Sequence, residues 1–258
     1  MGTRTISKIT GLFQFCPVSL VFEKIAFIRM TSFIEKHNII NASQFGFRKG
    51  HSTIMPLLKF YDSVSNDIDN KKFSIGIFID LKKAFDSLDH NILLSKLLHY
   101  GFRGPCHAWI SDYLSSRSQS VFIDGTLSSS RLIKFGVPQG SILGPLLFIL
   151  FINDIVSSSS ILKFLLFADD TNLMYSHSNI ETLFSTVNKE LDKLATWFNL
   201  NRLSLNLNKT NYILFGYKRT RVPAHLSLTI DGTLILEVDH TKFLGIYTSI
   251  LNFRGTFM

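Results

Sequence analysis

Two neighbouring acids, Asp169 and Asp170, lie between two apolar runs within residues 162–175. The pattern predicts a β-hairpin with both acids at its tip. Aspartate is also common in tight turns, because its side chain hydrogen-bonds nearby backbone, so the pair alone leaves a structural explanation open. A third acid, Asp80, ends another strand-like run at 73–80. Carboxylates presented together from strand ends repel one another unless a hard cation lies between them, so the three acids are candidate ligands of Mg²⁺, which prefers oxygen.

The elements that must position these acids follow from the periodicity of apolar residues. Helices are expected at 18–37, 54–64, 86–100, 105–114, 141–154 and 179–200, and strands at 71–80, 118–124, 131–135, 162–175, 212–215, 226–230 and 234–238. Ser52 is the expected cap of the second helix, and the third helix is expected to start at Asp86 or Ser87. The second helix is expected to turn one face inward, made of Ile54, Leu57, Leu58, Tyr61 and Val64. Antiparallel strands with helices packed behind them predict an α+β domain.

Two further stretches are rich in glycine. Residues 136–148 are apolar but contain three glycines and two prolines. Glycine lets another backbone or a ligand approach closely, although the Gly-x-x-Gly spacing is weakly specific by itself. In the basic stretch 44–53, Arg48 and Lys49 precede a helix, where a solvated charge pair and a contact to phosphate or base are both open.

The composition is that of a folded, basic protein. The chain has 258 residues, of which 46% are hydrophobic, so it can bury the core of one or two domains and is not disordered. Its 27 Lys and Arg residues exceed its 19 Asp and Glu residues, which gives a net charge of +8. A positive charge favours an anionic partner, most often nucleic acid or a membrane surface.

The cysteines and the apolar runs disfavour further classes of protein. Cys16 and Cys106 are far apart and fit no paired metal spacing, so a disulfide scaffold and a zinc site are disfavoured. The longest apolar run, 142–152, is too short to span a bilayer and is broken by glycine and proline. We therefore expect an intracellular protein, in the nucleus or the cytoplasm, with no membrane partner.

Six stretches together resemble the reverse transcriptases of non-LTR (LINE-type) retrotransposons, the jockey-like group in particular. They are residues 44–53, 78–86, 136–145, 167–170, 205–210 and 243–245. The resemblance covers roughly residues 15–248. One such stretch is weak evidence, whereas six in the family's order and at plausible spacing make coincidence improbable.

The resemblance implies a right-hand polymerase fold with an antiparallel palm sheet. Residues 1–72 would then be fingers and N-terminal helices, 73–240 the palm with a fingers insertion around 100–135, and 241–258 the start of a thumb that is mostly missing. The implied activity is RNA-directed DNA synthesis, with an RNA template, a DNA primer and dNTPs as partners.

The resemblance also assigns the acids. Asp80, Asp169 and Asp170 would be the catalytic residues and the ligands of two Mg²⁺ ions, with Mn²⁺ as an alternative. Asp80 would be the first ligand, Asp169 would bridge both ions, and Asp170 would be the weaker third acid. In this chemistry a primer 3′-hydroxyl attacks the α-phosphate of a dNTP and pyrophosphate leaves, and two ions about 3.5–4 Å apart stabilise the attacking and leaving oxygens.

The implied nucleotide-binding residues are Arg48, Leu81, Phe85, Gln139, Gly140 and Lys209. Phe85 would lie beneath the sugar and exclude a ribose 2′-hydroxyl, although an ordinary core phenylalanine is the alternative. Gln139 and Gly140 match positions near the template and the incoming sugar, and Arg48 resembles the fingers arginine that contacts the triphosphate and base. Lys209 matches a palm lysine proposed to protonate pyrophosphate, although a lysine before a strand is usually only solvated.

Departures from the family pattern keep other classes open. The family usually has an arginine where this chain has Cys16, and residues 252–258 do not follow the pattern. We therefore expect a piece of a larger element or a degraded copy, and a catalytically inactive nucleic-acid-binding remnant is the alternative function. An RNA-dependent RNA polymerase is a further alternative. A role without nucleic acid would leave the three acids of a basic chain unexplained.

Overall fold

The computed structural model describes residues 17–115, 117–120, 122–123, 125–138, 140–216, 223 and 225–249, and only the backbone of residues 17–19, 119 and 122. Cys16 and Gln139 lie outside the described residues. The helices are α1 (Pro17–Lys36), α2 (Ile54–Asp69), α3 (His90–His99), α4 (Pro105–Ser115), α5 (Gly144–Ile152), the 3-10 helix η1 (Asn153–Ser158) and α6 (Ile180–Leu200). The long strands are β1 (Phe73–Ile79), β6 (Lys163–Phe167), β7 (Asp170–His177), β8 (Asn211–Gly216) and β10 (Thr233–Glu237). The short strands are β2 (Ser118–Gln119), β3 (Phe122–Ile123), β4 (Thr126–Leu127), β5 (Arg131–Leu132), β9 (Leu228–Ile230), β11 (His240–Phe243) and β12 (Ile246–Ser249).

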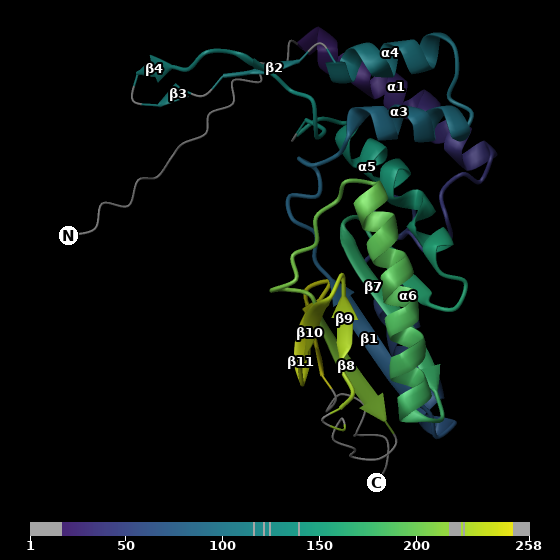
Figure 1. The fold of residues 1–258 in the computed structure, drawn as a ribbon. Coiled ribbons are helices and arrows are strands. Elements are labelled where there is room, and N and C mark those ends of the chain that lie inside the picture. The colour runs from purple at the N-terminus through teal and green to yellow at the C-terminus, as the bar shows by residue number, and fades with distance from the viewer. Residues whose placement is uncertain are drawn as a thin grey trace.

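One six-stranded sheet organises the described chain, in the order β6-β7-β1-β8-β10-β9. Its pairs are antiparallel except for β8 with β10, which is parallel. Figure 1 shows α6 running along this sheet, with α1, α3 and α4 gathered beyond one end of it. The predicted α+β class with an antiparallel sheet is therefore confirmed, apart from the single parallel pair.

The central strand β1 is buried on both faces because helices cover both sides of the sheet. Ile75 and Ile77 belong to the larger core cluster, which also contains α5 and the inner face of α6. Phe78 belongs to the opposite cluster, which contains Phe60 of α2. Gly76 makes room for this helix, since a Cβ at that position would lie 3.0 Å from the Phe60 ring.

The first turn of α2 is oriented differently from the prediction. Ile54 and Leu58 are exposed, at 60% and 57%, whereas Leu57, Phe60 and Val64 are buried. The helix turns this face inward because Phe60 fills the space over the sheet. The cap prediction is also wrong, since Thr53 precedes the helix and makes no side-chain capping hydrogen bond.

The third helix begins later than expected. Asp89 is its N-cap, and its carboxylate accepts hydrogen bonds from the backbone N–H groups of Asn91 and Ile92 at 2.9 and 3.1 Å. Residues 86–88 instead contact the glycine-rich stretch 136–148. The N–H of Gly136 donates to the Leu88 carbonyl at 2.7 Å, and a Cβ at Gly136 would lie 2.7 Å from a backbone oxygen of this segment.

The single hairpin expected from strands 118–124 and 131–135 is instead two short pairs, β2 with β5 and β3 with β4. The remaining expected elements are present with small shifts in their ends. The segment expected as one helix at 141–154 forms α5, whose residues are almost all buried, followed by η1. The hairpins expected at 162–175 and 226–238 are β6 with β7 and β9 with β10. Across the described residues, no helix has the length and low charge that crossing a bilayer requires.

Candidate active site

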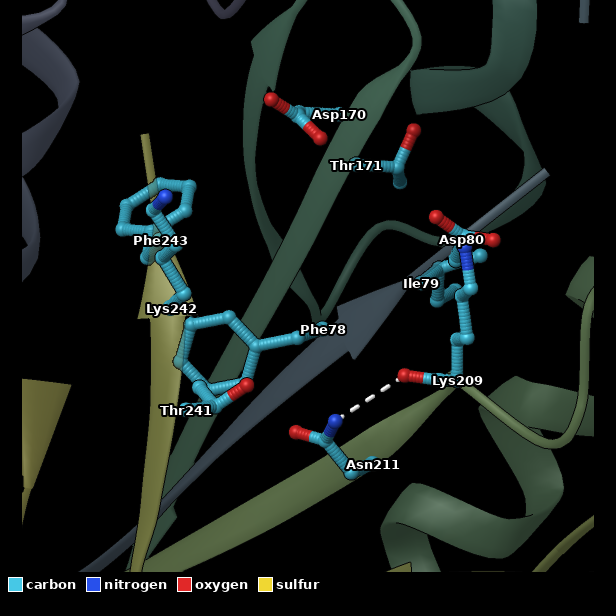
Figure 2. Close-up of a pocket in the computed structure, with 10 residues that line it drawn as sticks. All are labelled: Phe78, Ile79, Asp80, Asp170, Thr171, Lys209, Asn211, Thr241, Lys242 and Phe243. Carbon is cyan, nitrogen blue, oxygen red and sulfur yellow. Dashed lines mark hydrogen bonds between the residues drawn. The ribbon is translucent and has the colours of Figure 1, made fainter. Parts of the chain in front are cut away.

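The pairing of β1 with β7 brings the first acid to the other two. The register places Ile79 opposite Thr171, so Asp80 and Asp170, the next residues outward, end on neighbouring strands. Figure 2 shows both carboxylates at the same end of the sheet. Positions 90 residues apart in the chain therefore meet because two central strands share a register.

Asp169 lies in a two-residue turn between β6 and β7. Phe167 pairs with Asp170, which leaves Ala168 and Asp169 as the acidic turn. Ala168 has φ of 57°, a left-handed conformation that costs energy for a residue with a Cβ. Such strain persists only where the surroundings enforce it.

The segment before β8 holds Asp80 in place. Thr210 Oγ1 accepts from the Asp80 N–H at 3.3 Å, and the Asp80 carbonyl accepts from the Asn206 N–H at 2.8 Å. The Asn206 side-chain amide also donates to Asp80 Oδ2 at 2.7 Å. Residues 206–210 therefore fix both the backbone and the carboxylate of Asp80.

Electrostatic repulsion acts among the acids. Burial raises the pKa of Asp169, with a further rise from the charge of Asp80 and an opposing hydrogen bond from its own backbone. Burial likewise raises the pKa of Asp170, followed by the charges of Asp169 and Asp80. Asp170 is exposed, so water screens part of this repulsion. A bound cation would reverse the repulsive contribution to both pKa values.

The three carboxylates do not form a closed ligand cage. In the described part of the chain, no three His, Cys, Asp or Glu side chains converge closely enough to hold a metal ion by themselves. The acids thus meet at one end of the sheet without forming a ligand set by themselves, and the Asp80 carboxylate is hydrogen-bonded to Asn206. The site still fits Mg²⁺, which usually keeps waters and binds through one or two carboxylates plus substrate phosphates.

A pocket of about 90 Å³ opens beside the acids. Its lining residues are Phe78, Ile79, Asp80, Asp170, Thr171, Lys209, Asn211, Thr241, Lys242 and Phe243 (Figure 2). Two carboxylates and two lysines thus share one small polar site, a combination suited to a metal ion together with an anionic ligand.

A family model described as reverse transcriptase (RNA-dependent DNA polymerase) matches residues 22–248. The chain belongs to this family. Its polymerases generally use divalent metal ions, in keeping with the acid cluster.

The relatives of this reverse transcriptase domain include polymerases of Drosophila non-LTR retrotransposons. The probable RNA-directed DNA polymerase from transposon BS of Drosophila melanogaster is 30% identical over 250 residues, which are 94% of this chain and 27% of the relative. The RNA-directed DNA polymerase from mobile element jockey of the same species is 28% identical over 233 residues, 88% of this chain and 25% of the relative. The chain therefore spans about a quarter of the length of these relatives.

Solved structures show the right-hand polymerase fold. Apo telomerase from Candida tropicalis, truncated from its C-terminal domain, aligns with a TM-score of 0.59 at 14% identity and covers 89% of this chain and 43% of that chain. Telomerase from the same organism with the TWJ fragment of telomeric RNA also has a TM-score of 0.59, at 14% identity, and covers 92% of this chain and 37% of that chain.

In this reverse transcriptase domain, Phe85 packs partly against the hydrophobic core. Its ring stacks on Phe148 with centroids 4.4 Å apart and meets Phe47 edge-on at 6.4 Å. The ring is half-buried, so one part packs and another part remains accessible. Both interpretations of Phe85 are compatible with this position.

The remaining predicted nucleotide contacts lie in different surroundings. Arg48 donates to the carbonyl oxygens of Gln44 and Asn41, at 2.9 and 3.3 Å, so one edge of its guanidinium closes its own loop. The Leu81 side chain is buried. Gly140 has φ of 82° and open space where a Cβ would lie, and it is exposed. Lys209 is exposed and lines the pocket.

Several residues of the site were not singled out from the sequence. Asn206 and Thr210 lie within a recognised stretch, but nothing in their spacing indicated a contact with Asp80. Lys242 was expected in a thumb, yet the hairpin of β11 and β12 brings it to the pocket. The turn of this hairpin has φ of 48° at Leu244 and 89° at Gly245, and the glycine was the available signal for it.

Proposed function

We propose that this reverse transcriptase domain catalyses RNA-directed DNA synthesis, extending a DNA primer with dNTPs on an RNA template. The observation that carries the proposal is the register of β1 and β7, which puts Asp80 beside Asp170 with Asp169 in the adjoining turn. The raised pKa values of Asp169 and Asp170 support it, since partly desolvated carboxylates that repel one another are stabilised by a cation. The net charge of +8 suits a nucleic acid partner.

The proposed cofactor is a pair of Mg²⁺ ions, with Mn²⁺ as an alternative. Asp80, Asp169 and Asp170 would hold them, and Asp169 would contact both. When bound, such ions neutralise charge on the attacking and leaving oxygens.

The chain's own residues would position the substrates and select the nucleotide. Asn206 orients the Asp80 carboxylate. Lys209 and Lys242 line the same pocket and supply positive charge there, where a triphosphate or the primer backbone would lie. Phe85 would exclude a ribose 2′-hydroxyl, and the guanidinium nitrogens of Arg48 that face away from its loop would contact the nucleotide, together with Gln139 and Gly140.

We also propose boundaries for the subdomains of the polymerase fold. Residues 1–72 would form fingers and N-terminal helices, and the palm would begin at residue 73, with a fingers insertion around 100–135. The hairpin of β11 and β12 packs on the palm sheet, since the Phe243 ring centroid lies 5.6 Å from that of Phe78 in β1. We therefore place the palm boundary after this hairpin rather than at residue 241. Because the proposed substrates are an RNA template and dNTPs, we also propose an intracellular location, in the nucleus or the cytoplasm.

Primer extension tests the proposal. With poly(rA)/oligo(dT), dTTP and Mg²⁺, we expect the parent chain to extend the primer and Asp169→Asn to lose activity by about 10³-fold or more, because a carboxylate ligand is lost. Asp192→Asn, on the exposed face of α6, is the matched control and should behave as the parent.

Other outcomes identify the alternatives. Binding of the primer-template by the parent without extension would favour the inactive remnant. Wild-type-like extension by Asp169→Asn would refute its assignment as the bridging ligand. A parent that prefers rNTPs would make the substrate assignment wrong, whereas a preference for dNTPs that Phe85→Ala relaxes would support the role of the ring.

A further inference from the structure

A buried glutamine lies directly against the acidic turn. Gln44 is 0% exposed, and its side-chain Oε1 accepts from two backbone N–H groups, those of Gly46 at 2.8 Å and Ala168 at 3.1 Å. Two N–H donors on one atom identify that atom as the amide oxygen. Gln44 and Ala168 are 124 positions apart in the chain, and Ala168 directly precedes Asp169.

The backbone around Gln44 adds a short parallel pairing to the edge of the sheet. The Phe45 N–H donates to the Leu166 carbonyl at 2.8 Å, and the Leu166 N–H donates to the Ser43 carbonyl at 2.9 Å. Gln44 is thereby fixed to β6 just before the acidic turn begins. From this position the Gln44 side chain reaches the N–H of Ala168.

The neighbours of Gln44 complete a brace. Gly46 lies so close to the turn that a Cβ there would come within 2.2 Å of the Ala168 nitrogen. Arg48 returns to the carbonyls of Asn41 and Gln44 and closes residues 41–48 into one loop. Glycine is required at 46 because the contact is with backbone, which cannot move aside.

The chemistry of the amide indicates a purpose beyond filling space. Gln44 Nε2 is buried and has no hydrogen-bond partner among the described residues. A buried unpaired donor is unfavourable, so an apolar side chain of similar size would pack better if packing were its only role. What the amide provides is an acceptor for the N–H of Ala168, the residue held at φ of 57°.

We propose that Gln44 is a positioning residue for Asp169. Its carbonyl oxygen holds Ala168 in the left-handed conformation, and this conformation sets the direction in which the Asp169 carboxylate leaves the turn. Gln44 touches only backbone and acts through Asp169, and the inference rests on the proposed polymerase function. A small displacement of a catalytic group lowers the rate of the chemical step more than it weakens substrate binding.

Four proteins test this role: the parent, Gln44→Met, Ala168→Gly and the double variant. Glycine adopts a left-handed φ without penalty, so in the Ala168→Gly background the brace is no longer needed. We expect Gln44→Met to lower kcat for dTTP by about tenfold or more, with KM changed less than about threefold. In the Ala168→Gly background the same substitution should lower kcat by less than about threefold.

A matched control separates positioning from stability. Asn188 also joins distant backbone, accepting from the Thr229 N–H at 3.0 Å and donating to the Ser227 carbonyl at 2.9 Å, but it links α6 to the region of β9. Asn188→Leu should lower the denaturation midpoint while leaving kcat unchanged.

Each result decides the inference. An unchanged kcat in folded Gln44→Met, or an equal loss in both backgrounds, would overturn it. If Gln44→Met does not fold, recovery of the fold by Ala168→Gly supports the brace and failure to recover it counts against the brace. If the parent extends no primer, the proposed function fails for this chain, and the denaturation midpoints of the four proteins decide instead: coupled effects support the role of Gln44, and additive effects overturn it.

Discussion

At the scale of single residues, the site combines charges that repel with side chains that restrain them. Asp169 and Asp170 have raised pKa values, first from burial and then from neighbouring acids. Asp80 instead has its carboxylate bonded to the neutral amide of Asn206. A neutral donor orients the carboxylate without cancelling its charge, which leaves that charge available to a cation.

Asp169→Asn should stabilise the fold at neutral pH while it abolishes activity. Because the folded state raises the pKa of Asp169, folded protein binds more protons than unfolded protein between the ordinary and raised values, so stability falls as pH rises through that window. Removing the charge should recover roughly 1 kcal/mol or less at pH 7, since the carboxyl is partly solvated.

Urea denaturation at neutral and acidic pH measures this effect. The difference between Asp169→Asn and the parent should shrink toward acid, where the parent carboxyl is protonated. Asp192→Asn, at an exposed position of α6, is the control and should leave the denaturation midpoint at neutral pH as in the parent. A variant less stable than the parent at pH 7 would contradict a raised pKa of Asp169 in the folded state.

At the scale of elements, short connecting segments decide where the acids point. Residues 203–210 lie beside the end of β1, through the bridge of Leu81 with Leu205 and the bond from the Lys82 N–H to the Ser204 carbonyl at 2.8 Å. Residues 43–46 perform the corresponding task for the acidic turn. Each segment is hydrogen-bonded to a strand or its end through backbone groups, and each also places one amide side chain against the site.

Asn206→Leu should release the Asp80 carboxylate. The loss of a hydrogen bond to a charged group should lower the free energy of unfolding by about 1 kcal/mol and kcat by roughly tenfold. Asn208→Leu, exposed in the same segment, is the control and should change neither quantity. Equal effects of the two substitutions in primer extension and urea denaturation would show that the Asn206 amide has no special role.

At the scale of the whole molecule, helices on both faces of the sheet make β1 the most enclosed strand. Its two clusters of apolar side chains meet across it, and the acids emerge at its end, where the helices no longer cover it. A rigid sheet therefore carries the charged groups, while loops and the hairpin of β11 and β12 complete the pocket.

The net charge of +8 predicts salt-dependent binding of nucleic acid. Affinity for poly(rA)/oligo(dT) should fall by about tenfold or more between 50 and 200 mM salt, because bound counterions are released from the phosphates. Lys209→Gln should reduce the slope of log K against log salt by about 1 if this lysine contacts phosphate. Fluorescence anisotropy measures both, and Lys189→Gln on the outer face of α6 provides the control. An unchanged slope for Lys209→Gln would place Lys209 outside the nucleic acid contact.

The sequence by itself determined the class, the order of most elements and the identity of the three acids. Apolar periodicity is a local property, so α1, α4, α6 and the hairpins followed from it, whereas the start of α3 and the inner face of α2 did not, because distant contacts with Gly136 and the sheet fixed them. Six short stretches identified the family because its chemistry constrains residue types at fixed places.

Only the tertiary structure decided which groups hold the acids. Asn206 is 126 residues from Asp80, and Gln44 is 124 residues from Ala168, so no local pattern could pair them. The register of β1 with β7, the approach of Gly46 to the acidic turn and the arrival of Lys242 at the pocket are likewise products of packing. Chain spacing names the residues that can do chemistry, but hydrogen-bond partners distant in sequence set the directions in which those residues act.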